Sequence, residues 1–298
     1  MDLESFTIAV YCRIDEVMQE MHADPDWRKV RTRGPAPVLA DSEVLTMEVV
    51  GEFLGMDHDV AIYRYFRREH PDWFPALRQV HRTTFTRQAA NLWAVKEQLW
   101  RRLLDRVAYD PTLALVDSMP VPVCRFGRAY GCRRFRGQAA FGRDPGSKAT
   151  FYGFRDHLRV HWPGVVTAIS VAPANVHDLE VVPELVDGAV GQVLGDRNYW
   201  APKLTAELAS AGIRLLAPFK KHASDPDPAG SRRLARLRWR IETVAAQFVD
   251  RFHLKRLWAR DVWHLTSRLL RKVLSHTCAV YLCLAHGLPP LQFAHLLD

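Results

Sequence analysis

The sequence predicts an α/β protein, with a mixed five-stranded sheet and flanking helices, preceded by an all-helical N-terminal region. Apolar residues recur at three-and-four spacing through roughly the first 108 residues, which is typical of amphipathic helices. After Tyr109 the pattern changes to short, β-branched apolar runs that alternate with helical segments. The 298 residues are enough for two domains, and we expect a boundary between residues 1–108 and 109–298.

The N-terminal region contains three predicted helical segments. Ser42 is placed to cap a helix that ends at Gly55, a short helix is expected over 59–69, and a strong amphipathic pattern covers 84–107. The arginines of the second segment either face DNA, as in a helix-turn-helix, or form a solvated surface. DNA binding and dimerisation therefore both remain open for this region.

The remainder of the chain predicts the sheet and its helices. Three hairpin-like strands followed by strand–helix–strand crossovers indicate a mixed sheet with helices packed against it. The expected strands are 113–117, 151–161, 165–171, 192–196 and 213–218, and the expected helices are 179–186, 202–210, 232–249 and 262–284.

The charge is distributed unevenly along the chain. Lys and Arg exceed Asp and Glu by 8 overall, but residues 1–108 carry 15 basic and 17 acidic side chains, a balance of −2. The following 190 residues therefore carry 26 basic against 16 acidic side chains, a balance of +10. A surplus of this size predicts a polyanionic partner.

Cysteine spacing and hydropathy predict the compartment. Five cysteines without CxxC spacing indicate neither a disulfide framework nor a zinc site. The acidic start of the chain does not resemble a secretory signal, and no apolar run approaches the roughly 20 residues that span a membrane. We therefore expect a cytoplasmic protein that has no membrane association and is found with the nucleoid when it acts.

Three carboxylates have positions that suggest catalysis. Asp117 closes the first predicted strand, Asp196 closes the fourth, and Glu242 lies on the helix after the fifth. If the first and fourth strands are neighbours, the two aspartates lie side by side at the sheet rim, where open α/β sheets bind ligands. Three converging carboxylates repel one another unless a cation compensates them, and two Mg²⁺ or Mn²⁺ ions fit both the charge and the hard oxygen donors. Taken singly, each acid also fits a plainer role, as a turn or helix-capping residue or, for Glu242, as an ion-pair partner of Arg238.

Two basic clusters predict contacts with DNA. The glycine-rich segment 124–148 interleaves aromatic residues with cations, a composition suited to wrapping phosphates and stacking on unpaired bases. The second cluster repeats every four residues along the glutamate helix, and two lysines follow the fifth strand. A solvated surface is the alternative for each cluster. The expected DNA contacts are Arg125, Arg128, Arg133, Arg134, Arg136, Lys148, Lys220, Lys221, Arg232, Arg236, Arg238 and Arg240.

The chain resembles the DDE transposases of bacterial insertion sequences, which are members of the RNase-H-like, retroviral-integrase-like superfamily. The resemblance rests on short blocks in the expected order, namely Asp117-Ser-Met-Pro-Val-Pro-Val-Cys124, Phe151-Tyr-Gly-Phe with His157-Leu, Ala172-Pro-Ala-Asn-Val-His-Asp178, Leu194-Gly-Asp-Arg-Asn-Tyr199 and Arg240-Ile-Glu-Thr-Val244. Residues 39–45 also resemble the helical start of one branch. Related branches carry a Tyr seven residues before the glutamate and a Lys seven after it; here Ala235 and Val249 stand there, and Lys255 or His253 are candidates to replace the Lys.

The resemblance implies an RNase-H-like catalytic domain and DNA transposition. Two copies of the chain would pair the terminal inverted repeats of an element on double-stranded DNA, cut at their ends and use the freed 3′-hydroxyl to attack target DNA. Asp117 would contact both metal ions, Asp196 one and Glu242 the other. It also implies that an aromatic residue at Tyr199 or Trp200 stacks on a flipped base, although packing in the core explains these residues equally well.

Other interpretations remain open at this stage. His177 and Asp178 are either groups that support the metal ligands or a helix cap. The function itself has two alternatives, which are a related RNase-H-like nuclease without strand transfer and a non-enzymatic DNA-binding regulator that uses residues 1–108.

Overall fold

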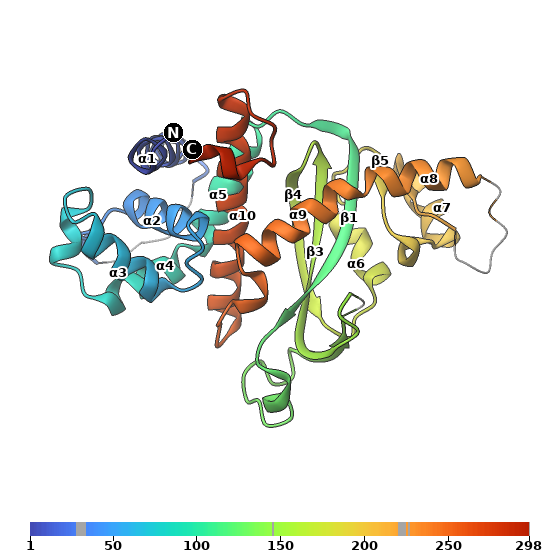
Figure 1. Ribbon diagram of the computed structural model, residues 1–298, viewed down its shortest axis with the longest axis horizontal. Coiled ribbons are helices and arrows are strands. Elements are labelled where there is room, and N and C mark those ends of the chain that lie inside the picture. Colours follow the sequence, from blue (N-terminus) through green and yellow to red (C-terminus); the bar gives the residue numbers. More distant parts are fainter. Residues whose placement is uncertain (28–33, 145, 220–224, 226, 298) are drawn as a thin grey trace. The chain divides into compact units, whose positions relative to one another are not determined.

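The computed structural model describes residues 1–27, 34–144, 146–219, 225 and 227–297, and the chain divides into two compact units (Figure 1). The helical unit comprises Met1–Val107 together with Phe248–Asp298, and the sheet unit comprises Ala108–Gln247. The sequence had placed residues 248–298 with the sheet. The structure instead groups this C-terminal segment with the N-terminal helices.

The helical unit is built from long helices at both ends of the chain. Its α-helices are α1 (Leu3–Ala23), α2 (Asp41–Phe53), α3 (Asp59–Glu69), α4 (Arg82–Asn91), α5 (Trp93–Leu104) and α10 (Val262–Ala285). The amphipathic pattern expected over 84–107 is divided between α4 and α5, because Leu92 has non-helical backbone angles (φ −81°, ψ 11°). None of the described helices is long and apolar enough to span a membrane.

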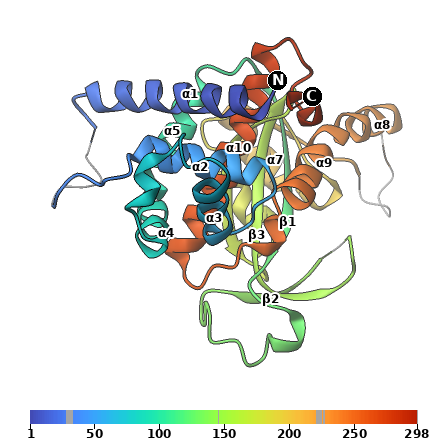
Figure 2. The same cartoon turned by 60° about the vertical axis from the view of Figure 1, so that its left-hand side comes forward.

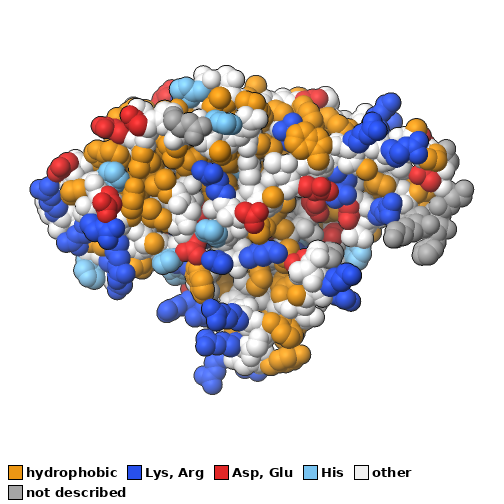
Figure 3. All heavy atoms as spheres, in the orientation of Figure 1, with side chains coloured by type: hydrophobic (Ala, Val, Ile, Leu, Met, Phe, Trp, Pro, Cys, Tyr) orange, Lys and Arg blue, Asp and Glu red, His pale blue; other side chains and the backbone are white. Residues whose placement is uncertain are grey.

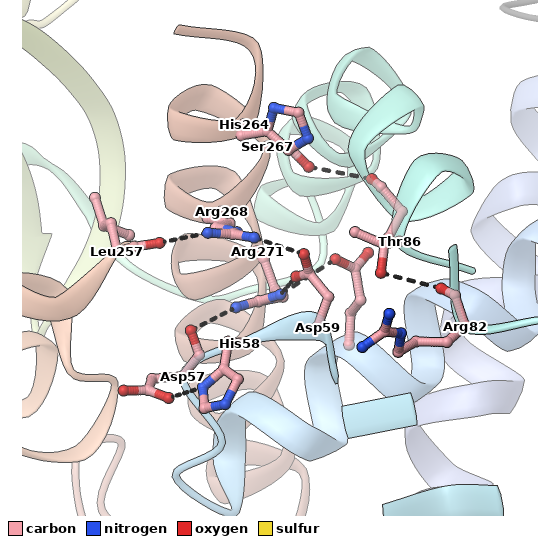
Figure 4. Close-up of polar contacts among 12 residues, drawn as sticks. Asp57, His58, Asp59, Arg82, Thr86, Leu257, His264, Ser267, Arg268 and Arg271 are labelled. Atoms are coloured by element: carbon pink, nitrogen blue, oxygen red, sulfur yellow. Dashed lines mark hydrogen bonds and ion pairs between the residues drawn. The ribbon is translucent and has the colours of Figure 1, made fainter. Parts of the chain in front are cut away.

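Buried ion pairs explain why α10 belongs to the helical unit. Arg271 of α10 is fully buried and pairs with Glu52 of α2 and Asp59 of α3, at 2.6 Å in each case. Lys272 also pairs with Glu52, and Figure 4 shows Arg268 and Arg271 converging on the start of α3. Removing one partner of such a buried pair costs about 3–5 kcal/mol, because the other charge is then left uncompensated. The acids on α2 and α3 therefore require the cations of α10.

The sheet unit contains the mixed sheet that the sequence predicts. Its strands are β1 (Asp110–Pro122), β2 (Ala140–Arg143), β3 (Thr150–Trp162), β4 (Val165–Pro173), β5 (Gly191–Leu194) and β6 (Ile213–Leu216). The five expected strands are ordered β4-β3-β1-β5-β6; β3 runs antiparallel to β1 and β4, whereas β1, β5 and β6 are parallel. This arrangement confirms the expected RNase-H-like fold.

The short strand β2 is an addition to the five strands that the sequence predicts. It pairs with the start of β3 and lies in the glycine-rich segment 124–148, where no strand was expected. Gly142 makes the pairing possible, because a Cβ at this position would lie 2.5 Å from the carbonyl oxygen of Ala174. The glycine therefore serves close packing here.

Helices cover both faces of the sheet. On one face Ala114, Val193 and Leu215 occupy neighbouring strands and form a core with α6 (Asp178–Leu185), while α7 (Pro202–Ser210) packs at its side. The other face of β1 is crossed by α9 (Trp239–Ala246), which follows α8 (Pro228–Leu237) (Figure 1). The single helix expected over 232–249 is thus divided at Arg238, and α9 lies across the strand that carries Asp117.

Candidate active site

Asp117 lies on β1 at the point where this strand loses its parallel neighbour. The pairing of β1 with β5 ends at Leu115, but β1 continues beside β3 to Pro122. Asp117 therefore does not close its strand, as the sequence had suggested, because the antiparallel hairpin extends the strand by five residues. Its half-buried side chain still stands at the carboxyl end of the parallel part of the sheet, and it accepts a 2.8 Å hydrogen bond from the backbone N–H of Ser118.

Asp196 follows β5, the neighbour of β1, and caps a short 3-10 turn. Its carboxylate accepts hydrogen bonds from the backbone N–H of Asn198 at 2.8 Å and from the Asn198 side chain at 3.2 Å. Gly195 allows this turn, since a Cβ at this position would lie 2.5 Å from the ring of Tyr199. The predicted adjacency of the two strands is confirmed, and the charge of Asp196 acts on Asp117.

Glu242 reaches the same region from α9, with Arg238 between it and Asp117. The Nη2 atom of Arg238 lies 3.6 Å from Oδ2 of Asp117 and 3.9 Å from Oε1 of Glu242. Glu242 is 61% exposed. The sequence left open an ion pair between Glu242 and Arg238, and the structure contains it. The guanidinium of Arg238 thus lies near two of the three acids, Asp117 and Glu242.

The electrostatics of Asp117 indicate a site that requires positive charge. Burial, together with the charges of Asp196 and Asp178, raises the pKa of Asp117 to about 6, against the opposing effects of the hydrogen bond from Ser118 and the charge of Arg238. Even beside the guanidinium of Arg238, the pKa of Asp117 stays above its usual value. The site can therefore accommodate further positive charge, such as a divalent cation. The hard oxygen donors of Asp117, Asp196 and Glu242 fit Mg²⁺ or Mn²⁺ by their chemistry.

The described residues do not form a preassembled metal cage. No three His, Cys, Asp or Glu side chains in the part of the chain that the structure describes are close enough to hold an ion together. The acids instead surround Arg238, which occupies the region between Asp117 and Glu242. Ion binding would consequently require Arg238 to move or the acids to draw closer.

Asp178 is a fourth acid near this site, and the structure decides between the roles left open for it. The helix cap of α6 is His177, whose Nδ1 accepts a hydrogen bond from the backbone N–H of Leu179. Asp178 is therefore not the cap of this helix. Its carboxylate accepts a 3.1 Å hydrogen bond from the hydroxyl of Ser118, and its Oδ1 lies 3.9 Å from Nδ1 of His157. Its position beside Ser118 places it next to Asp117, whose pKa it raises.

His157 belongs to one of the segments on which the family resemblance rests, but nothing in the sequence indicated a role for it at the site. It is fully buried on β3 opposite Ser118, and burial lowers its pKa to about 4. With this lowered pKa the imidazole is neutral at pH 7, so it lies beside Asp178 without adding a charge. Its signal in the sequence was weak, since the pairing register of β1 and β3 alone brings it there.

The two aromatic residues after Asp196 have different environments. Tyr199 is 1% exposed and belongs to the core between the sheet and α6, so in this structure it cannot stack on a base. Trp200 is half-buried, and its ring lies 5.8 Å from that of Phe219. The core alternative therefore holds for Tyr199, and base stacking remains a prediction for Trp200 alone.

The expected DNA-contacting residues fall into three groups. Six are exposed on the segment between β1 and β3 and two on α8, while Arg240 is held between the rings of Trp162 and Trp239, at 4.7 and 4.0 Å from their centroids. Arg240 is therefore engaged, and Arg238 faces the carboxylates. Lys220 and Lys221 lie outside the described residues. The exposed cations are Arg125, Arg128, Arg133, Arg134, Arg136, Lys148, Arg232 and Arg236.

Asp117 and Asp196 follow the point where β1 and β5 cease to pair in an RNase-H-like sheet. This combination of fold and acids defines a class of nucleic-acid-processing enzymes. Comparison with known families agrees, since residues 108–257 match the family described as Transposase DDE domain. The match covers half of the chain, and the protein belongs to this family. Domains of this family generally use divalent metal ions. The chain matches no curated protein and no solved structure.

Proposed function

We propose that this transposase catalyses metal-dependent cleavage of DNA and strand transfer at the ends of a bacterial insertion sequence, by in-line phosphoryl transfer. The observation that supports the proposal is that Asp117 and Asp196 belong to neighbouring parallel strands, while Arg238 lies within 4 Å of both Asp117 and Glu242 of the crossing helix. Double-stranded DNA, as terminal inverted repeats and as target, would be the substrate. Two copies of the chain would act together on it.

Asp117, Asp196 and Glu242 would hold the divalent ions. When bound, two Mg²⁺ or Mn²⁺ ions lower the pKa of the attacking water or 3′-hydroxyl and stabilise the oxygen that leaves. Ser118 orients Asp117 through its backbone N–H, and the side chain of Asn198 together with the backbone N–H of that residue orients Asp196. These hydrogen bonds fix both carboxylates before substrate arrives, which supports a site that requires defined ligand positions.

The basic residues of the sheet unit would hold the DNA. Arg232 and Arg236 are exposed on α8, the helix that leads directly into the glutamate helix α9. Their charges would bind phosphates next to the carboxylates. Arg238 would contribute its charge to the substrate phosphates once it leaves the acids.

The first prediction concerns Asp117. Asp117→Asn keeps the shape of the side chain but removes its charge, so we expect Mg²⁺-dependent nicking of terminal-repeat DNA to fall by at least roughly 100-fold, the loss caused by changes around metal ligands. Far-UV circular dichroism and DNA binding should remain unchanged. Asp110→Asn, an exposed acid on the same strand, is the matched control and should nick normally. Normal nicking by Asp117→Asn would remove this residue from the mechanism.

The same assay separates the alternatives. A labelled 3′-end that becomes joined to target DNA identifies strand transfer, whereas cut product alone identifies a nuclease. Specific binding by the helical region with no effect of Mg²⁺ on the DNA would indicate a non-enzymatic regulator.

A further inference from the structure

The segment between β1 and β3 carries an exposed aromatic surface that the proposed chemistry does not use. We call residues 123–144 and 146–149 the arm; Figures 1 and 2 show it extending beyond the end of the sheet, with β2 as its return strand. Tyr130 is 85% exposed, Phe126 47% and Phe141 39%. Large apolar rings that remain exposed together mark interaction sites.

The three exposed rings form one connected row. The ring centroid of Tyr130 lies 5.1 Å from that of Phe141, with an interplanar angle of 33°, and 6.4 Å from that of Phe126. Phe141 in turn lies 5.1 Å from Tyr152, which is buried on β3. The row therefore begins at Tyr152 in the sheet and ends at Phe126, and Tyr130 is its most exposed ring.

Other residues of the arm hold this row in place. Phe135 is 5% exposed and packs edge-on against Phe154 of β3, with ring centroids 5.2 Å apart. The hydroxyl of Tyr152 donates a 3.4 Å hydrogen bond to the carbonyl oxygen of Phe135. Of the four aromatic residues of the arm, Phe135 thus anchors it to β3 and the other three are exposed.

The charge of the arm indicates what the exposed rings meet. Residues 123–149 contain six arginines and one lysine against one acid, Asp144, a balance of +6. Ser147 donates a 2.9 Å hydrogen bond to that acid within the arm. Figure 3 shows basic and hydrophobic side chains gathered on the lobe that the arm forms. A cationic surface with exposed rings is suited to a ligand that is both polyanionic and aromatic, which is nucleic acid.

We infer that the arm binds unpaired DNA bases, which stack on Tyr130 and its neighbours Phe126 and Phe141 while the arginines contact the adjoining phosphates. In a duplex the faces of each base are covered by its neighbours, so aromatic stacking favours unpaired bases, whereas phosphate contacts are available in both forms. The inference deepens the proposed function, because it rests on DNA as the substrate and names unpaired strands near the element end as the form that the arm takes.

The test measures binding without chemistry. Full-length protein carrying Asp117→Asn is titrated, by fluorescence anisotropy, into three labelled DNAs: a blunt duplex, the same duplex with several unpaired bases at one end, and the single strand. Tyr130→Ala should weaken binding of the two DNAs with unpaired bases by roughly 5- to 150-fold, the loss of one stacked base, and change duplex binding less than twofold. Tyr130→Phe should bind like the parent.

Matched variants distinguish stacking from charge and from folding. Arg134→Ala should weaken all three DNAs alike and reduce the salt dependence of binding by about one phosphate contact. Tyr11→Ala, an exposed tyrosine outside the arm, should change nothing. Equal effects of Tyr130→Ala on duplex and unpaired DNA, no effect on either, or no binding of any DNA by the parent would each overturn the inference. Failure of wild-type protein to nick DNA would contradict the proposed function alone, since these titrations need no cleavage.

Discussion

At the scale of single residues, Arg238 decides the present state of the candidate active site. Its guanidinium lies within 4 Å of both Asp117 and Glu242, where the proposed chemistry requires divalent cations. A guanidinium can neutralise carboxylates, but it cannot lower the pKa of a bound water as a metal ion does. The structure therefore represents a charge-compensated site that metal ions can enter only in competition with Arg238.

This competition can be measured with Arg238→Gln. The variant lacks the cation between two acids, so it should melt at a lower temperature than wild type without metal. Mg²⁺ should then raise its melting temperature more than that of wild type. A tenfold gain in the affinity for Mg²⁺ corresponds to about 1.4 kcal/mol of stabilisation, which raises the melting temperature of a domain of this size by roughly 3–5 °C. Arg236→Gln, exposed on α8, is the control. Equal Mg²⁺ shifts in all three proteins would contradict the competition.

The positions of the acids were largely predictable, but their immediate environment was not. Asp117 and Asp196 could be placed together on the condition that the first and fourth predicted strands are neighbours, and the pairing of β1 with β5 meets this condition. His157 lies beside them because of the register of β1 against β3, and Asp178 lies there because α6 begins at that point. Register depends on packing between distant segments, and a single sequence does not display it.

At the scale of elements, the differences from expectation arise where tertiary contacts override local pattern. The periodicity over 232–249 continues through Arg238, yet the chain breaks there into α8 and α9, and the break directs Arg238 toward the carboxylates. Strand β2 forms within a glycine-rich segment, and its own glycine, Gly142, leaves room for the close approach of Ala174. The long helix α10 was recognised, but its partners were not. Its cations are buried, which its apolar pattern did not reveal.

The burial of His276 in the core around α10 predicts that the folded protein loses stability at acidic pH. This residue is fully buried, stacked on Phe248 at 5.1 Å, and burial lowers its pKa to about 3. Between pH 6.5 and about 3 the unfolded chain binds a proton at His276 that the folded chain does not. Stability therefore falls as the pH falls, by up to about 1.4 kcal/mol per pH unit from this group.

Urea unfolding at a series of pH values checks this expectation. His276→Phe should reduce the pH slope of the unfolding free energy between pH 4 and 6 by up to about 1.4 kcal/mol per unit, while the slopes above pH 8 stay equal. Cys278→Ala is a control from the same helix; burial raises the pKa of this thiol to about 12, so the variant should lose stability without a change of slope. Identical slopes in wild type and His276→Phe would contradict the assignment.

At the scale of the whole molecule, the two units divide the charge differently from the linear sequence. The sheet unit carries 19 basic and 13 acidic side chains, a balance of +6, whereas the helical unit carries 22 and 20. The arm alone has a balance of +6, so it accounts for the entire surplus of the sheet unit. The charge of +10 that the sequence assigned to the C-terminal two-thirds thus included cations of α10 that are neutralised in the core of the helical unit.

A chain that ends at Gln247 tests this division. It lacks Arg268, Arg271 and Lys272, so Glu52 and Asp59 would remain in an apolar core without these partners. Each broken buried pair costs about 3–5 kcal/mol, against a total stability of about 5–15 kcal/mol for a domain. The helices α2, α3 and α5 should therefore lose hydrogen-exchange protection, as read by mass spectrometry.

The strands of the sheet unit provide the internal control, because their pairing involves no residue beyond Gln247. Amides of β1, β3 and β5 should remain protected in the shortened chain. A full-length Arg271→Met variant, which removes one cation and keeps the bulk of α10, should give intermediate protection in α2 and α3. Full protection of α2 without residues 248–298 would mean that the N-terminal helices form a unit by themselves, and that α10 stabilises them less than its buried ion pairs require.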